Sequence, residues 1–242
     1  MGNFKNNFSE LLLLANENIK IKDKESDFEF EIIPMKLKDI LFDDNLGTFL
    51  STIDKEVEEL SKMIPQAEIK SHFGFIRTVC VLGKRKEEVK DFANSLEKGL
   101  KKIIPDISFS GQIFYIQERV LNNEIFEEIL EIIYKIMEKE KILIKEGDDE
   151  FTKREKMIKL RAQRLRKNGK KEKEKEEGSG LKNVIASIIY EFPQYKVEDI
   201  FNLNIYTFNY LTKYIGKIAN YEVSKIAAGN GLTKKHMYFI EK

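Results

Sequence analysis

The residue types that most often carry catalysis or bind metal ions are few in this sequence and lie far apart. Histidine occurs only at His72 and His236, and cysteine only at Cys80. A zinc site needs three or four nitrogen, sulfur or oxygen ligands, and Cys80 with His72 would supply at most two. Cys80 lies within an apolar run, which favours a small buried hydrophobic residue over a nucleophile. We therefore expect neither a metal site nor catalytic residues.

Two further patterns could bind phosphate or transfer protons. The segment LGKRKEE at 82–88 follows an expected strand, but a P-loop needs a glycine where Thr78 stands and a Ser or Thr where Arg85 stands. Adjacent carboxylates occur at 43–44 and 148–149. The first pair precedes an expected helix and the second lies in a charged loop, and both are common places for solvated acids. The sequence thus predicts no cofactor and a protein that is not an enzyme.

A basic segment is the third candidate. Residues 151–177 carry twelve Lys and Arg against five Glu, a net +7 that leaves −6 for the rest of a chain whose total is +1. Such cations can bind nucleic-acid phosphates. However, no aromatic residue that could stack on a base lies between Lys153 and Gly180. Nucleic-acid binding through a basic helix at 153–171 is therefore the less favoured interpretation, and its contacts would be Arg154, Arg161, Arg164, Arg166 and Lys167.

The pattern of apolar residues predicts an α+β fold. Alternating or β-branched stretches indicate strands at 27–32, 72–82 and 107–116. Apolar residues at three-to-four spacing indicate helices at 46–64, 86–104, 118–141, 181–192 and 204–228. We expect three parts: an N-terminal α+β domain with a small sheet and several helices at 1–150, a basic helix and charged flexible linker at 151–180, and a small all-α domain at 181–242.

Composition indicates a globular protein of a reducing compartment. With 42% hydrophobic residues in 242, the chain can bury a core. A single cysteine excludes an intrachain disulfide and is typical of a reducing environment. The apolar stretch at 11–15 is too short for a signal peptide or a membrane span. We expect a cytoplasmic protein with no membrane partner.

The helix expected at 204–228 carries two apolar tracks. One consists of Ile, Leu and Phe residues, and Tyr206, Tyr210 and Tyr214 follow beside it at a spacing of four. An ordinary core is one interpretation, because aromatic residues at helical spacing usually pack inside. A partner surface is the other, because tyrosine combines a large apolar area with a hydroxyl that tolerates water. The candidate partner-binding residues are Tyr206, Phe208, Tyr210 and Tyr214.

The C-terminal third has a particular order of segments. It runs from KREKMIKLRAQRLRK through a Lys/Glu and Gly/Ser linker and VIASIIYEF to VEDIFNLNIYTFNYLTKYIGKIANYEV. Asn204 can cap the last helix through its side chain, and Thr207 follows one turn later. This order resembles tail-assembly chaperones of tailed bacteriophages, which often have Thr at the first of these positions and Gln at the second. The residues that match the family's pattern are Ile200, Leu203, Ile205, Tyr206 and Phe208.

The resemblance implies a non-catalytic role in the cytoplasm of an infected bacterium. Proteins of that family coat the hydrophobic tape-measure protein and deliver tail-tube subunits during virion tail assembly. The implied partners are therefore the tape-measure and tail-tube proteins, and self-association remains open. A nucleic-acid-binding or anti-defence phage protein acting through the basic helix at 153–171 is the alternative.

Overall fold

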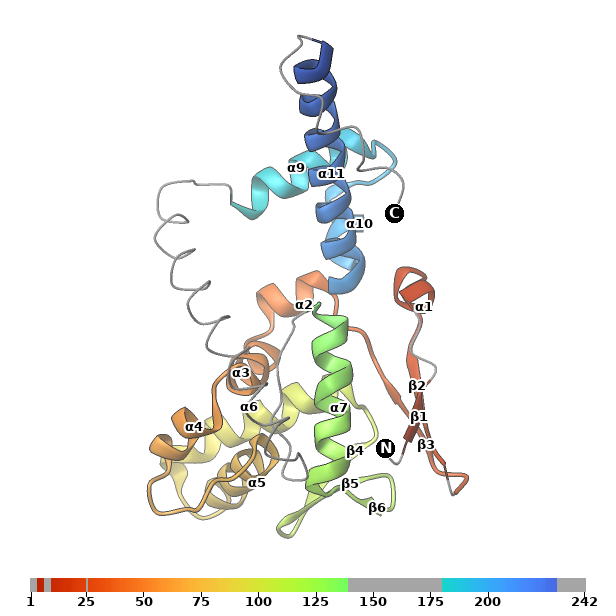
Figure 1. The fold of residues 1–242 in the computed structure, drawn as a ribbon. Helices are drawn as coiled ribbons and strands as arrows, with labels where there is room; N and C mark the ends of the chain where they lie inside the picture. The colour runs from red at the N-terminus through yellow and green to blue at the C-terminus, as the bar shows by residue number, and fades with distance from the viewer. Residues whose placement is uncertain (1–3, 7–9, 25, 139–179, 230–242) are drawn as a thin grey trace, which may run out of the picture. The chain divides into compact units, whose positions relative to one another are not determined.

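The computed structural model describes residues 4–6, 10–24, 26–138 and 180–229 (Figure 1). Small antiparallel sheets combine with helices in a mixed α+β fold, as the apolar pattern predicts. The chain divides into two compact units. The first unit comprises Met1–Glu138 and Glu198–Asn209, and the second comprises Lys139–Val197 and Tyr210–Lys242. This division groups residues 198–209, expected in the C-terminal helical part, with the N-terminal residues.

Two three-stranded antiparallel sheets belong to the first unit. The first joins β1 (Phe4–Asn6), β2 (Ile19–Asp23) and β3 (Glu29–Ile32) in sequence order, and Ile21 pairs with Phe30. Alternate residues of β2 are buried, so one face of this sheet covers the core. The second sheet joins β4 (Ile107–Ser110), β5 (Ile113–Ile116) and β6 (Arg119–Val120). The strand predicted at 27–32 is confirmed.

The strand predicted at 107–116 is a hairpin of two strands. Gly111 in its turn has a φ of 63°, a left-handed conformation that glycine adopts without steric cost. The two sheets contact each other through polar groups. Arg119 forms an ion pair with the buried Asp23, and the Gln117 side chain donates to the Glu29 carbonyl oxygen at 3.1 Å.

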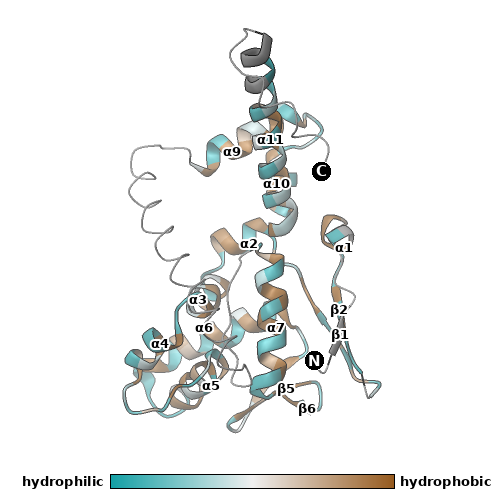
Figure 2. Cartoon of the chain, in the orientation of Figure 1, coloured by the Kyte–Doolittle hydropathy of each residue, from teal (hydrophilic) through white to brown (hydrophobic). Residues whose placement is uncertain are grey.

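The N-terminal stretch of the first unit also contains helices. They are α1 (Glu10–Leu14), α2 (Leu37–Phe42), α3 (Asp44–Ile53), α4 (Val57–Met63), α5 (His72–Gly83), α6 (Glu87–Ile103) and α7 (Asn123–Ile136). Helices α3 to α6 lie on one side of α7 and the β1–β3 sheet lies on the other (Figure 1). Figure 2 shows α7 with alternating hydrophobic and hydrophilic bands, as an amphipathic helix requires.

Two of the predicted elements of this unit are wrong. The segment 72–82 is helix α5 and not a strand, and Ser71 caps it by accepting a hydrogen bond from the Gly74 amide at 3.0 Å. The helix predicted at 46–64 is interrupted between Ile53 and Val57. The prediction at 86–104 is confirmed by α6. Helix α7 starts later than predicted because Asn122 caps it, and residues 139–141 lie outside the described part.

The C-terminal helices largely follow the predicted pattern. They are α9 (Leu181–Glu191), the short unpredicted α10 (Val197–Asn202) and α11 (Ile205–Gly229). The Asn204 side chain accepts a hydrogen bond from the Thr207 amide at 2.8 Å, which confirms the predicted cap of α11. Within the described residues, no helix has the length and hydropathy that a membrane crossing requires. The basic helix and linker expected at 151–180 lie outside the described residues except for Gly180.

Candidate partner-binding surface

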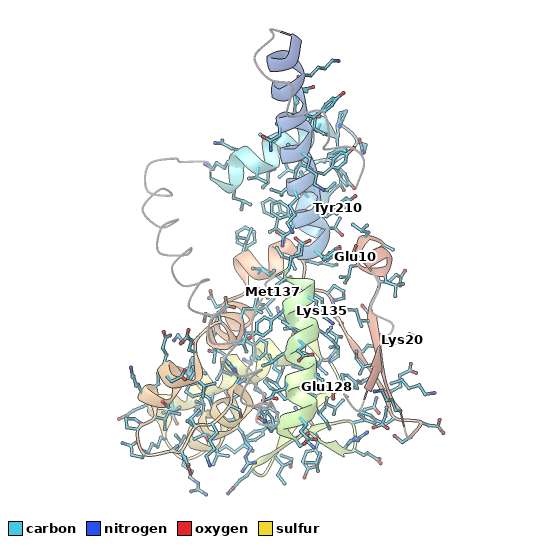
Figure 3. The ribbon with its side chains drawn as sticks, in the orientation of Figure 1. Glu10, Lys20, Glu128, Lys135, Met137 and Tyr210 are labelled. Carbon is cyan, nitrogen blue, oxygen red and sulfur yellow. The ribbon has the colours of Figure 1, made fainter. Side chains whose placement is uncertain are left out.

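The four candidate partner-binding residues divide into two groups. Tyr206 and Phe208 are 7% and 8% exposed and belong to the first unit. Tyr210 and Tyr214 are each 44% exposed and belong to the second unit (Tyr210 is labelled in Figure 3). The surface available to a partner is therefore narrower than the sequence suggests, because burial leaves Tyr206 and Phe208 little area to offer.

Tyr206 and Phe208 are buried because the segment that holds them is anchored in the first unit. The anchor is Asn204, which is fully buried. Its side-chain Nδ2 donates to the Leu13 carbonyl oxygen at 2.5 Å and to Asn16 Oδ1 at 3.2 Å. The hydroxyl of Thr207 donates to the same Leu13 oxygen at 3.1 Å. The side chains of Asn204 and Thr207 thus make hydrogen bonds within the chain itself.

Backbone hydrogen bonds reinforce this anchor. The Ile205 amide donates to the Met35 carbonyl oxygen at 2.8 Å, and the Leu37 amide donates to the Leu203 carbonyl oxygen at 2.9 Å. An antiparallel bridge between Lys36 and Asn204 results. An unpaired buried polar group costs about 1–3 kcal/mol, so this set of satisfied groups fixes the position of the segment. We call residues 198–209 the anchored segment.

A group of aromatic rings lies in the second unit, with Tyr210 and Tyr214 exposed and Phe192 and Tyr195 half-buried. The rings of Tyr210 and Tyr214 stack, with centroids 6.5 Å apart and an interplanar angle of 13°. Phe192 lies 6.0 Å from Tyr214, and Tyr195 lies 6.4 Å from Phe192 at 83°. Ring pairs at these separations attract each other by about 0.5–1.5 kcal/mol beyond the area that they bury. We call Phe192, Tyr195, Tyr210 and Tyr214 the aromatic surface.

Helices α9 and α11 also carry buried apolar residues in the second unit. Ile185 and Ile188 of α9 are 9% and 0% exposed, and Leu211 of α11 is 8% exposed. The same two helices carry further exposed tyrosines, Tyr190 at 84% and Tyr221 at 47%. The second unit therefore combines a packed apolar core with an aromatic exterior.

Two members of the aromatic surface, Phe192 and Tyr195, were not predicted as contacts. They flank the turn at Pro193, and a turn of this kind is easily treated as a simple connector. Their signal in the sequence is the placement of two aromatic residues on either side of a proline, directly after an amphipathic helix. Only the structure brings this turn against Tyr214.

Cys80 and His72, the candidates for catalysis or metal binding that the structure describes, are both buried. Burial raises the pKa of the Cys80 thiol to about 12, an effect that Glu97 increases and Lys84 opposes. The thiol is neutral at pH 7, so Cys80 is no ready nucleophile. A ring nitrogen of the buried His72 lies 2.9 Å from the Lys55 carbonyl oxygen. Over the described residues, no group of three or more His, Cys, Asp or Glu could hold a metal ion.

The candidate nucleic-acid contacts cannot be placed against these features. They all fall between 139 and 179, which lies outside the described residues. These contacts are Arg154, Arg161, Arg164, Arg166 and Lys167.

Comparisons of the chain with protein-family models, with curated proteins and with solved structures find no match.

Proposed function

We propose that this protein is a non-catalytic binding protein and that its aromatic surface holds an apolar helical segment of another protein. The observation that carries the proposal is the stacked pair Tyr210 and Tyr214, each of which remains 44% exposed. Tyrosine is enriched at protein interfaces because its ring supplies contact area and its hydroxyl can remain hydrated.

The contacts among the rings favour the binding of a partner, because they hold the side chains in place in advance. Stacking of Tyr214 on Tyr210, and its contact with Phe192, restrict the side chains before any partner arrives. A side chain that is already ordered loses less conformational entropy on binding, where each flexible side chain costs about 0.5–1.5 kcal/mol. An amphipathic helix with apolar residues at three-to-four spacing is the type of partner that suits a row of rings along a helix.

The narrower form of the proposal is a phage tail-assembly chaperone that binds the tape-measure protein and tail-tube subunits in the host cytoplasm. Its support is the resemblance of the C-terminal third. The residues that match the family's pattern, Ile200 to Phe208, belong to the anchored segment. In this chain those residues support the fold, and the client surface begins beyond them, at Tyr210.

The test of the broader proposal compares two variants of the full chain. Tyr210→Ser with Tyr214→Ser removes the stacked pair, and Tyr190→Ser removes an 84% exposed tyrosine of α9 that lies outside the aromatic surface. The probe is a labelled amphipathic peptide of about 20 residues, followed by fluorescence anisotropy. We expect the double variant to bind about tenfold more weakly, because central aromatic contacts carry most of the energy of an interface.

The Tyr190→Ser control shows whether the loss of any exposed tyrosine weakens binding. We expect the Tyr190→Ser variant to bind within about twofold of the wild type, and both variants to keep the wild-type circular dichroism and melting temperature, since exposed positions contribute little to stability. If the folded double variant and the wild type had equal affinity for the peptide, the proposal would be wrong.

Co-expression tests the narrower role. A tape-measure protein that is insoluble alone should become soluble when expressed with the wild-type chain, and less so with the double variant. If the amphipathic peptide binds while tape-measure and tail-tube proteins do not, the binding proposal stands and the tail-assembly role is wrong.

Nucleic-acid binding through 153–171 is the second candidate, and the +7 of residues 151–177 is the observation behind it. Changing Arg154, Arg161, Arg164, Arg166 and Lys167 to Gln together would remove its contacts. Titration of both forms with single-stranded RNA at two salt concentrations decides, because phosphate contacts weaken steeply with salt. Absence of binding by the wild type at low salt excludes this candidate.

A further inference from the structure

An open cavity of about 310 Å³ lies in the first unit, where the turn between α5 and α6 meets β4. Sites for small molecules start at about 300 Å³, so the cavity has room for a small ligand. Charged side chains dominate its lining: Lys84, Arg85, Lys86 and Lys90, together with Glu87 and Glu97. Four cations thus face two carboxylates.

The cations outweigh the carboxylates at the rim. Lys90 and Glu87 form an ion pair at 2.9 Å and largely neutralise each other. Glu97, which is half-buried on the wall, is the remaining carboxylate of the lining. Lys84, Arg85 and Lys86 therefore leave a net positive charge at the cavity.

Lys84 is held in place by two contacts. Its Nζ donates to the Gly111 carbonyl oxygen at 3.2 Å and lies 4.2 Å from the centroid of the Phe109 ring. A cation over an aromatic ring is attracted to the electron-rich face of the ring. The ammonium group is thus ordered in the absence of a ligand, which lowers the entropic cost of binding an anion.

Backbone hydrogen bonds order the turn that carries Arg85 and Lys86. The amides of Arg85 and Lys86 both donate to the Leu82 carbonyl oxygen, at 2.9 and 2.8 Å, so the turn is tight. A Cβ on Gly83 would lie 2.5 Å from the Ala93 Cβ, and the close approach of α5 to α6 therefore requires glycine. Helix α6 then starts at Glu87 without a side-chain cap, and its first amides add to the positive potential.

We propose that this cavity binds a small phosphorylated molecule. A phosphate group offers up to two negative charges and several acceptor oxygens, which match the Lys84, Arg85 and Lys86 donors that one turn places in the lining. Asn94 and Glu97 on the α6 wall select for a ligand that also carries hydroxyl or amino donors, because a carboxylate repels a bare anion. The site is not a P-loop: its cations come from a turn between two helices.

Isothermal titration calorimetry of the full chain tests the site, with adenosine monophosphate, inorganic phosphate and a single-stranded oligonucleotide as probes. The variant Arg85→Gln with Lys86→Gln should bind the monophosphate about tenfold more weakly, because the phosphate would lose two charged donors. The matched control is Lys98→Gln with Lys101→Gln, which removes the same charge from exposed positions of α6 outside the cavity.

The substitution Glu97→Gln should change the affinity for phosphate in the opposite direction. Removing a negative charge from the lining of the cavity should strengthen binding of inorganic phosphate about threefold, because the carboxylate repels the anion across a hydrated site. The affinity of the Lys98→Gln, Lys101→Gln control for each probe should stay within about twofold of the wild-type affinity, because salt screens exposed charges outside the cavity.

Three results would overturn the proposal. The first is no heat of binding from the wild type with about 5 mM monophosphate, a concentration at which even a millimolar affinity would be detected. The second is an equal loss of affinity in the cavity variant and in the matched control. The third is far tighter binding of the oligonucleotide than of the monophosphate, with a loss of oligonucleotide affinity in the cavity variant. The last outcome would assign the cations to a nucleic-acid backbone.

Discussion

The side chain of Asn204 donates a hydrogen bond to the backbone carbonyl oxygen of Leu13, 191 positions earlier in the chain. Its own oxygen accepts from the Thr207 amide at 2.8 Å, so one buried side chain both caps α11 and joins it to the N-terminal residues. A residue whose pattern suggests local capping therefore also makes a long-range contact.

Replacing Asn204 should destabilise the protein well beyond the loss of a cap. In Asn204→Ala, the Leu13 oxygen loses its Asn204 donor, though Thr207 still donates to it, and the Thr207 amide loses its acceptor. Such changes cost about 1–3 kcal/mol for each group left unsatisfied, and we expect a loss of about 2–3 kcal/mol in the free energy of unfolding. Urea denaturation followed by circular dichroism measures it.

Asn202 provides the control for this substitution. Its Nδ2 donates to the Glu198 carbonyl oxygen at 2.9 Å, but the residue is exposed and water can replace the bond. Asn202→Ala should change the free energy of unfolding by about 0.5 kcal/mol or less. Equal effects of the two substitutions would contradict the anchoring role of Asn204.

Glycine at position 99 is required by the contact between α3 and α6. A Cβ there would lie 2.4 Å from the Asn45 carbonyl oxygen and 2.7 Å from the Phe49 Cβ. Gly99→Ala should therefore destabilise the protein by about 1–3 kcal/mol, as overpacking generally does. Thermal unfolding should show a lower melting temperature.

Gly47 tests the same substitution without the clash. It lies in α3 and has no atom within 4 Å of an added Cβ. Alanine exceeds glycine in helix propensity by about 0.5–1 kcal/mol, so Gly47→Ala should raise the melting temperature. If both variants melted above the wild type, the close packing of α3 on α6 would be incorrect.

Cys80 should make stability fall at alkaline pH. Its pKa rises from 9.0 to about 12 in the folded chain because burial disfavours the thiolate. Between those values the folded chain keeps a proton that the unfolded chain releases, so the unfolded state gains stability as pH rises. Below pH 9 the contribution is fully present, and it is lost towards pH 12.

Comparison of the wild type with Cys80→Ala isolates this effect. From pH 9 to pH 10 the wild type should lose about 1 kcal/mol more than the variant, since one pKa unit corresponds to about 1.4 kcal/mol. The pKa of Tyr134 is also raised, by burial and by the Asp54 charge, but it contributes equally in both chains. Parallel stability profiles of the two chains across this range would rule out the raised thiol pKa.

Helix α5 shows where a sequence pattern is ambiguous. Its apolar, β-branched run predicts a strand, yet buried residues 72, 73, 75, 76, 79 and 80 follow helical spacing. A helix that is buried on most sides and a buried strand both appear as continuous apolar runs. The cap at Ser71 is the local signal that could have distinguished them.

Periodicity and capping chemistry in the sequence alone determined α6, α9 and α11, the cap at Asn204 and the apolar surroundings of Cys80, because these depend on residues within a few turns of each other. Tertiary structure alone decided that Tyr206 and Phe208 are covered while Tyr210 and Tyr214 stay exposed. The physical reason is that periodicity identifies the apolar face of a helix but not what covers it. Here the helix start beside Tyr206 is held by the backbone oxygens of Leu13 and Met35, which accept hydrogen bonds from residues about 170–190 positions away.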